Sequence, residues 1–309
     1  MKKLAVLFVV AAGVLWGCIG IFVRHYGELG LTPMQTVVIR IVLAAVIFSL
    51  FVLIYKPRLY KIKLKDLWCF LGSGVISVGF FTYCYFTSMA LSSLSVAAVL
   101  LYTAPAFVML FSLILFKEKL NAAKVISLVC AVLGCAMTTG VIGGNLTVTT
   151  AGFLFGLGSG ICYALYSIFS RFALNRGYDP MTITLYTFIF AAAVSVAVTD
   201  VRPVWQVVTA DAGSFGYAVL FAVASCVLPY TLYTLGLKYI ASSTASIIAT
   251  IEPVVATVVG AAVFAEPVAF PFGYIGIALV LLSVVLINMP IKKKGSSRIF
   301  VGWVTDGRD

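Results

Sequence analysis

The chain has 309 residues, of which 62% are hydrophobic and only 10% are charged, and its formal net charge at pH 7 is +11. A soluble domain is about half apolar and a quarter charged, so this composition excludes an ordinary water-soluble protein. Backbone amides in lipid must be hydrogen-bonded within the protein, which leaves only helices or a closed barrel. The apolar runs are about 20 residues long and do not alternate with polar residues, so they predict helices.

Ten apolar runs follow one another along the chain. The first five lie near residues 4–23, 36–55, 67–89, 94–116 and 123–141, and the second five near 152–170, 181–199, 214–237, 242–264 and 271–290. Lys2 and Lys3 precede the first run, as they would in a cleaved signal peptide, but the internal repeat of the chain includes this run. We therefore expect an all-α integral membrane protein with ten transmembrane helices.

Basic residues are distributed unevenly between the loops on the two sides of the membrane. With the N-terminus in the cytoplasm, 18 of the 21 Lys and Arg residues fall on the cytoplasmic side. Arg24 and Arg202 fall on the other side, and Arg40 lies inside a run. Cytoplasmic loops are rich in Lys and Arg, so the pattern predicts a plasma-membrane protein with both termini in the cytoplasm. It accounts for the net charge without a nucleic-acid partner.

The two halves of the chain resemble each other at an offset of about 147 residues. Thirteen identities fall in two ungapped blocks of 22 and 34 positions, where about five are expected by chance in so apolar a chain. The first block pairs Gly13, Ile21, Phe22, Arg24, Gly30, Pro33 and Met34 with Gly160, Ile168, Phe169, Arg171, Gly177, Pro180 and Met181. At an offset of 148, the second pairs Tyr85, Ser95, Ala97, Pro105, Phe116 and Glu118 with Tyr233, Ser243, Ala245, Pro253, Phe264 and Glu266.

This repeat predicts the domain organisation. Five helices occupy residues 1–141, a linker covers 142–151, five more helices occupy 152–290, and a polar cytoplasmic tail covers 291–309. Because five is odd, the second half enters the membrane from the opposite side, so the halves are inverted repeats. Inverted repeats recur in secondary transporters, where the two copies exchange conformations to open a central site to alternate sides.

Several motifs resemble the drug/metabolite transporter superfamily, and within it the EamA-like branch of ten-helix permeases. They are Gly13-Val14-Leu15-Trp16-Gly17 in the first helix, Arg40 in the second, Tyr102-Thr103-Ala104-Pro105 continuing to Lys117-Glu118, and Ile251-Glu252-Pro253-Val254 continuing to Ala265-Glu266. The likeness covers roughly residues 4–290 and implies two EamA-like repeats. It also implies the export of amino acids or other small metabolites.

Two ionisable residues lie within the predicted helices, where an unpaired charge is costly and must face protein or water. Glu252 is about ten residues into its helix and therefore near the bilayer midplane, where inverted-repeat transporters place their sites. It is either a binding or gating carboxylate that carries a proton, or a buried acid bonded to a neighbouring helix. We favour Arg40 as an interface anchor or outer-gate residue, with an ion pair to Glu252 as the alternative.

Pro105 and Pro253 interrupt two apolar helices and release the carbonyls of Leu101 and Ala249. Such groups survive in a membrane only beside protein or a wet cavity, so we expect these prolines to act in gating, with simple packing kinks as the alternative. Aromatic residues with polar tips in mid-helix favour a solute cavity, and about half of them should line it. The substrate-binding candidates are Trp16, Tyr83, Tyr85, Tyr102, Tyr163, Tyr230, Tyr233 and Glu252.

The pattern as a whole predicts a secondary transporter that exports a small metabolite by alternating access, with proton coupling as an option. A membrane-embedded enzyme is less favoured, since zinc-ligand spacing and a nucleophile elbow are missing from the sequence and His25 is its sole histidine. A channel is also less favoured, since rings of charge and a filter motif are missing. We expect a small metabolite and the lipid bilayer as partners, a monomer or weak homodimer, and neither cofactor nor metal. Helices 1, 3, 4, 6, 8 and 9 should surround the solute path.

Overall fold

A computed structural model of the chain describes residues 1–141, 148–268 and 270–289, and within these ranges every regular element is helical. Eight helical segments are long and apolar enough to cross a membrane. Two shorter apolar helices of 17 residues, about 26 Å each, complete ten crossings among the described residues. Every expected run therefore corresponds to a helix. Most of the expected linker and the whole expected tail lie outside the described residues.

The first half contains crossings 1 to 5, and three of these are interrupted. Crossing 1 comprises α1 (Lys2–Gly17) and α2 (Ile19–Glu28), and crossing 2 is α3 (Pro33–Tyr55). The short 3₁₀ turns η1 (Pro57–Tyr60) and η2 (Leu64–Asp66) lead to crossing 3, which comprises α4 (Leu67–Leu71), the π-helical segment η3 (Gly72–Phe80) and α5 (Phe81–Leu91). Crossing 4 is split into α6 (Leu94–Leu101) and α7 (Ala104–Phe116), and crossing 5 is α8 (Ala122–Thr138).

The second half repeats this plan over crossings 6 to 10. Crossing 6 is α9 (Thr150–Asn175), crossing 7 is α10 (Pro180–Val198), and α11 (Arg202–Val208) follows as a short helix of its own. Crossing 8 comprises α12 (Ala212–Ala222), the π-helical segment η4 (Val223–Val227) and α13 (Leu228–Leu237). Crossing 9 is split into α14 (Ser242–Ala249) and α15 (Ile251–Phe264), and crossing 10 is α16 (Phe272–Asn288).

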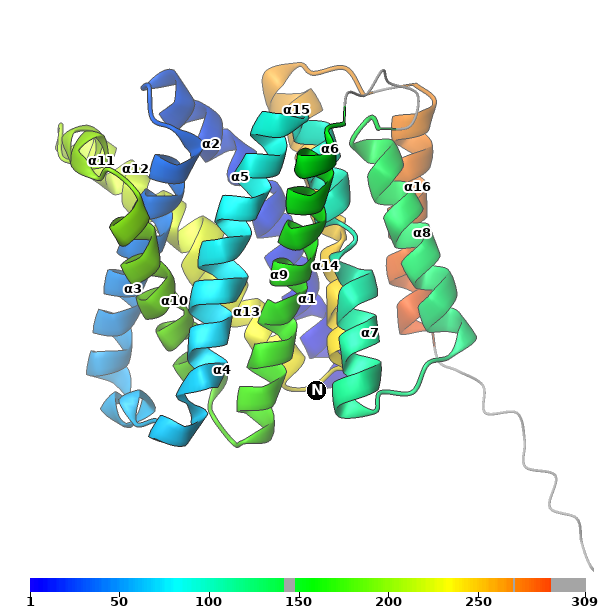
Figure 1. Cartoon of the computed structure of the whole chain (residues 1–309), viewed down its shortest axis with the longest axis horizontal. Coiled ribbons are helices and arrows are strands. Elements are labelled where there is room, and N and C mark those ends of the chain that lie inside the picture. Colours follow the sequence, from blue (N-terminus) through cyan, green and yellow to red (C-terminus); the bar gives the residue numbers. More distant parts are fainter. Residues whose placement is uncertain (142–147, 269, 290–309) are drawn as a thin grey trace, which may run out of the picture.

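The two halves enter the bundle from opposite ends (Figure 1). We call the end at which α1 begins the N-terminal face and the other end the opposite face; α9 begins at the opposite face. Equivalent turns follow both first crossings, because Gly30 and Gly177 both adopt left-handed backbone with φ of +80° and +83°. A proline then starts each second crossing, capped by the side chains of Thr32 and Asp179.

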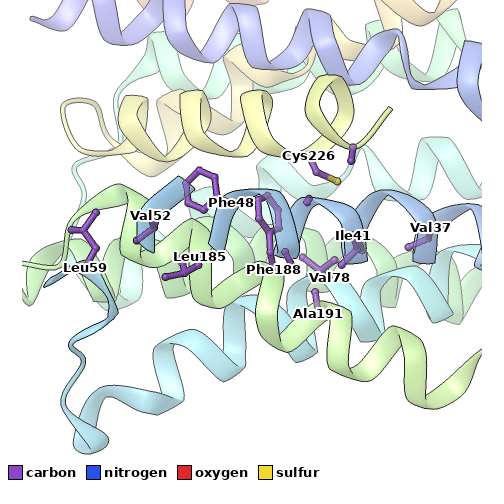
Figure 2. Close-up of a cluster of buried hydrophobic side chains, with 13 residues drawn as sticks. Val37, Ile41, Phe48, Val52, Leu59, Val78, Leu185, Phe188, Ala191 and Cys226 are labelled. Atoms are coloured by element: carbon purple, nitrogen blue, oxygen red, sulfur yellow. The ribbon is translucent and has the colours of Figure 1, made fainter. Parts of the chain in front are cut away.

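The largest apolar core joins crossings 2, 3, 7 and 8 (Figure 2). Phe48 and Phe188 pack edge to face with ring centroids 5.9 Å apart, and Ile41, Leu185 and Val78 are buried around them. In lipid such contacts stabilise through close packing rather than through the exclusion of water. This core is remote from the motifs of crossings 4 and 9.

Crossings 5 and 10 lie side by side at one edge of the bundle (Figure 1). A Cβ at Gly134 would lie 2.8 Å from the carbonyl oxygen of Gly276, and a Cβ at Gly276 would lie 2.7 Å from that of Gly134. The two backbones therefore touch at a crossing of small residues, as in many membrane helix pairs. These two helices brace crossings 4 and 9 from outside.

Candidate functional site

A cavity of about 480 Å³ enters the bundle from the opposite face. Its walls come from α2, the start of α3, the end of α5, the start of α6 and the end of α15. All these segments lie toward the opposite face, so the cavity opens there and narrows toward the middle of the bundle. Crossings 1, 3, 4, 8 and 9 line it as expected, crossing 6 was expected but does not line it, and crossing 2 is an unexpected addition.

The base of the cavity combines one carboxylate, one guanidinium and several aromatic rings. Glu252 and Arg40 both line it, together with Trp16, Tyr85 and Tyr102. The Tyr163 hydroxyl, from crossing 6, lies 3.5 Å from the Glu252 carboxylate and donates to it. Glu252 also lines a small void between the two split helices, so it stands between the open cavity and the closed half of the bundle.

Both split helices are interrupted at equivalent positions. In crossing 9, α14 ends at Ala249 and α15 begins at Ile251; in crossing 4, α6 ends at Leu101 and α7 begins at Ala104. Pro253 and Pro105 therefore stand in the first turn of a new helix, where a missing N–H costs nothing. The sequence predicted an interruption at the centre of each helix, and the structure has a break at each proline.

Glu252 lies in the first turn of α15, and this position suits a carboxylate. The first N–H groups of a helix point out of its N-terminus and carry partial positive charge, which stabilises an anion there. A helix start at mid-membrane is available only because crossing 9 is broken. The break thus explains how an acid is accommodated at this depth.

Glycines of crossings 1 and 6 allow the close approach of these helices to the two breaks. A Cβ at Gly17 would lie 2.7 Å from the carbonyl oxygen of Glu252, and one at Gly160 would lie 2.7 Å from that of Leu100. A Cβ at Gly13 would lie 3.2 Å from the carbonyl oxygen of Ala249. These glycines are therefore close packing points, and the packing partner of each is an interrupted helix.

Arg40 lies deeper than its expected position near the membrane interface. Crossing 2 begins at Pro33 rather than near residue 36, so Arg40 is seven residues into the helix. Its side chain lines the cavity that also contains Glu252, and its buried Nε has no hydrogen-bond partner among the described residues. The interface-anchor interpretation was wrong about where the side chain points. The outer-gate interpretation and the ion pair with Glu252 stay predictions.

The aromatic candidates separate into three groups. Trp16, Tyr85 and Tyr102 line the cavity, and Tyr163 contacts Glu252 beneath it. Tyr230 and Tyr233 instead pack behind Trp16, with centroid distances of 5.4 and 5.5 Å, and Ser167 shares a 2.7 Å hydrogen bond with Tyr233.

Tyr83 is 52% exposed on the outside of the bundle and stacks near Phe80. Tyr83 precedes Tyr85 by two residues, and two residues on a helix point to nearly opposite sides of it. Tyr83, Tyr230 and Tyr233 therefore do not line this cavity. Trp16, Tyr85 and Tyr102 do, in agreement with the expectation that about half of the aromatic candidates line it, and a role of any of them in substrate binding stays a prediction. Mid-helix position alone does not show which side of a helix faces the cavity.

Several lining residues were not expected from the sequence. They are apolar or belong to the rim: Phe81, Phe86, Met89, Phe221 and Phe264, with Arg24 and Glu266 at the mouth. Apolar side chains in a membrane helix give no signal that separates a cavity wall from a lipid-facing surface. Arg24 and Glu266 did have a signal, because both are identities of the internal repeat.

Comparison with known proteins agrees with this architecture. The family model of the EamA-like transporter family matches residues 3–140 and again 150–289. The chain belongs to this family. The two matches coincide with the two five-helix halves, and they place the chain among membrane transporters.

Relatives of known sequence support the family, and one solved structure shares the fold. An uncharacterized transporter of Archaeoglobus fulgidus is 28% identical over 65% of this chain and 70% of its own length, and a second one is 25% identical over 93% and 99%. The uncharacterized transporter YcbK of Bacillus subtilis is 25% identical over 84% of this chain and 85% of its own. One crystal structure superposes with a TM-score of 0.77 at 16% identity, covering 93% of this chain and 97% of that one, and so shares the fold.

Proposed function

We propose that the protein is a secondary transporter that moves a small amphipathic, zwitterionic metabolite of the amino-acid class by alternating access. The observation that carries the proposal is the cavity that runs from the opposite face and stops at Glu252, between two broken helices. Sites of inverted-repeat transporters are formed by discontinuous helices near the midplane, open to one side at a time. The EamA-like family supports the transport function.

The side chains at the cavity base suit a solute with both charges. The Arg40 guanidinium, which lines the cavity, is a donor for a carboxylate, and the Glu252 carboxylate is an acceptor for an ammonium group. Trp16, Tyr85 and Tyr102 offer aromatic faces to an apolar side chain. A zwitterion would therefore satisfy two groups that are costly to leave unpaired within a membrane.

The distribution of Lys and Arg supports a cytoplasmic N-terminal face in the plasma membrane. The present state is then open to the outside. Export would require the inward-open state to take up solute, with Glu252 carrying a proton in the opposite direction. Glu252 suits that role because a carboxylate in a site without bulk water readily binds either a proton or a cationic group.

Proteoliposomes test this function directly. Vesicles containing the purified protein and loaded with unlabelled amino acids should accumulate labelled amino acid transiently by counterflow, with saturating kinetics. A transporter requires this behaviour because one site is exposed alternately. Non-saturating flux without counterflow would indicate a channel, and chemical conversion of the solute would indicate an enzyme. Either outcome rejects the proposal.

A further inference from the structure

Two glutamates occupy equivalent positions at the two faces of the bundle, but they have different partners. Glu118 follows α7 at the N-terminal face, and its repeat mate Glu266 follows α15 at the opposite face. The preceding residues Lys117 and Ala265 both have φ of +53°. The Glu118 N–H bonds the Ser112 carbonyl at 3.1 Å, and the Glu266 N–H bonds that of Gly260 at 3.1 Å. The same left-handed turn therefore precedes both glutamates and places them equivalently at the ends of their helices.

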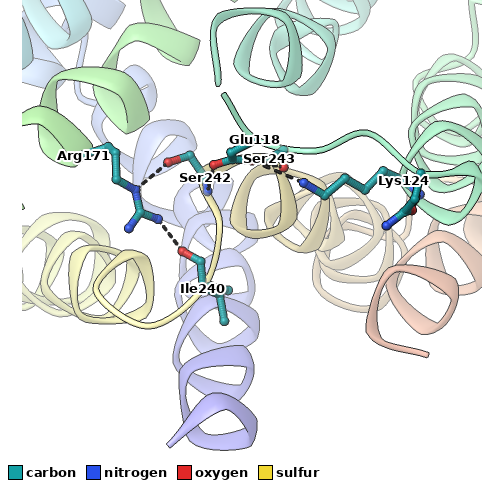
Figure 3. Close-up of polar contacts among 7 residues, drawn as sticks. Glu118, Lys124, Arg171, Ile240, Ser242 and Ser243 are labelled. Carbon is teal, nitrogen blue, oxygen red and sulfur yellow. Dashed lines mark hydrogen bonds and ion pairs between the residues drawn. The ribbon is translucent and has the colours of Figure 1, made fainter. Parts of the chain in front are cut away.

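At the N-terminal face Glu118 closes the bundle by binding the start of α14 (Figure 3). Its carboxylate accepts hydrogen bonds from the Ser242 N–H at 3.0 Å and from the Ser243 hydroxyl at 2.5 Å. Lys124 lies 3.3 Å from the same carboxylate. Arg171 completes the contact by donating to the Ser242 hydroxyl at 3.0 Å and to the Ile240 carbonyl. These bonds join crossings 4, 5, 6 and 9.

At the opposite face the equivalent contact is open. The mates of Ser242 and Ser243 are Leu94 and Ser95, at the start of α6. Among the described residues Glu266 pairs with Arg24, the mate of Arg171, and accepts nothing from the start of α6. Leu94 and Glu266 both line the cavity. The Glu266 side chain is 48% exposed, whereas that of Glu118 is 14% exposed.

We propose that these two glutamates are alternating gate latches, an inference that rests on the alternating access proposed above. In the state open to the N-terminal face, Glu266 binds the Leu94 N–H and the Ser95 hydroxyl at the start of α6, as Glu118 binds the start of α14 here. Glu118 then releases α14. Arg24 pairs with Glu266 while that latch is open, and Arg171 bonds the start of α14 while the Glu118 latch is closed. Each latch is a charge-assisted cap on a half-helix of the opposite repeat.

The two latches differ in strength because the two half-helices differ in their own caps. The first turn of α6 is capped by Ser93, whose hydroxyl accepts from the Val96 N–H at 3.2 Å. Its mate at the start of α14 is Ala241, which has no side chain to cap with. Glu118 therefore supplies a bond that α14 lacks, whereas Glu266 would add to a helix already capped. The protein should prefer the state seen here when no solute is bound.

Disulfide cross-linking tests the exchange without any knowledge of the solute. In a background with the seven native cysteines replaced, the pair Glu118→Cys with Ser243→Cys should cross-link rapidly. The pair Glu266→Cys with Ser95→Cys should cross-link slowly, and about tenfold faster or more when Glu118→Gln removes the opposite latch. Asp211→Asn, at an exposed helix cap of α12, is the matched control and should leave the second rate unchanged.

An unchanged Glu266–Ser95 rate in the Glu118→Gln background would overturn the proposal, provided that the variant remains monodisperse and keeps its melting temperature. If Glu118→Gln fails to fold, Ala241→Ser replaces it, because a local cap on α14 reduces the need for Glu118 and should raise the same rate. Failure there also overturns the proposal. Counterflow that fails while the cross-links still exchange would reject the proposed solute, not the latches.

Discussion

The breaks in crossings 4 and 9 have the same geometry but different chemistry. Each has a proline in the first turn after the break, a glycine of a neighbouring helix against its carbonyls, and a glutamate after its last turn. Crossing 9 alone has an acid in that turn, because Glu252 corresponds to Ala104. The shared features suit a motion that both halves perform, and Glu252 suits a task that one half performs. We therefore expect the shared features to serve the proposed motion and Glu252, which breaks the symmetry, to serve solute binding.

Among the changes that test this comparison, replacing Glu252 should have the largest effect on transport. Glu252→Gln keeps the shape and one acceptor but removes the titratable proton, so a proton-coupled transporter should lose pH-gradient-driven accumulation almost completely. Exchange of bound solute should persist, because it moves no net protons. Uptake after a pH jump and counterflow, measured in the same vesicles, separate the two activities. Ala104→Gln, at the equivalent position, is the control for a new polar group beside the breaks.

If gradient-driven uptake by Glu252→Gln equals that of the wild type, Glu252 is not the proton carrier. The acid would then be a structural group bonded to its neighbours. In that case the amide should either have no effect or lower the melting temperature, as expected for about 1–3 kcal/mol lost at a disturbed buried polar group.

Added side-chain volume should destabilise the protein equally at the two places where a neighbouring helix packs against a break. Gly17→Ala and Gly160→Ala each bring a methyl group within 2.7 Å of a backbone carbonyl, and overpacking costs about 1–3 kcal/mol. Gly20 has open space and Gly158 has an ordinary 3.6 Å contact, so alanine there should be neutral or slightly stabilising. Thermal unfolding in detergent measures all four. A tolerant Gly17 with a sensitive Gly160 would break the structural equivalence of the breaks.

Arg40 should contribute to affinity more than to folding. Arg40→Lys keeps the charge but loses the planar guanidinium, so the KM of a carboxylate-bearing solute should rise by about tenfold while the melting temperature changes little. An amine without a carboxylate should show no such change. A melting temperature that falls together with transport would assign Arg40 a structural role.

The smallest effects should come from Tyr83, which was a candidate for the cavity from sequence alone. Tyr83→Phe should leave transport unchanged, since this side chain lies on the outside of the bundle. Tyr85→Phe, two residues further on, should alter KM severalfold because its hydroxyl lies at the cavity. Transport kinetics of the two variants compare the two sides of one helix. Equal effects would contradict the orientation of crossing 3.

The sequence predicted helix number, helix limits and the repeat well because each has a strong physical signal. The length of an apolar run identifies a helix that crosses the membrane. The repeat identities of Gly30 with Gly177 and of Pro33 with Pro180 mark equivalent turns. The depth of Arg40 was missed because the Thr32 cap and Pro33 start crossing 2 several residues before its uniformly apolar part. Tyr83 was misassigned because crossing 3 has almost no amphipathic pattern to show its orientation.

The π-helical segments have a consequence for sequence variation. Segments η3 and η4 occur at equivalent places in crossings 3 and 8, since Val75–Gly79 corresponds to Val223–Val227. A π turn contains one residue more than the α turn that it replaces. Deleting one residue within 75–79 should therefore let the helix revert to α geometry with both flanks still facing their partners. The same deletion at Cys84 would rotate every following side chain by about 100°. Single-residue deletions should thus be tolerated at these two points inside the membrane, whereas elsewhere in a crossing they would misalign the helix.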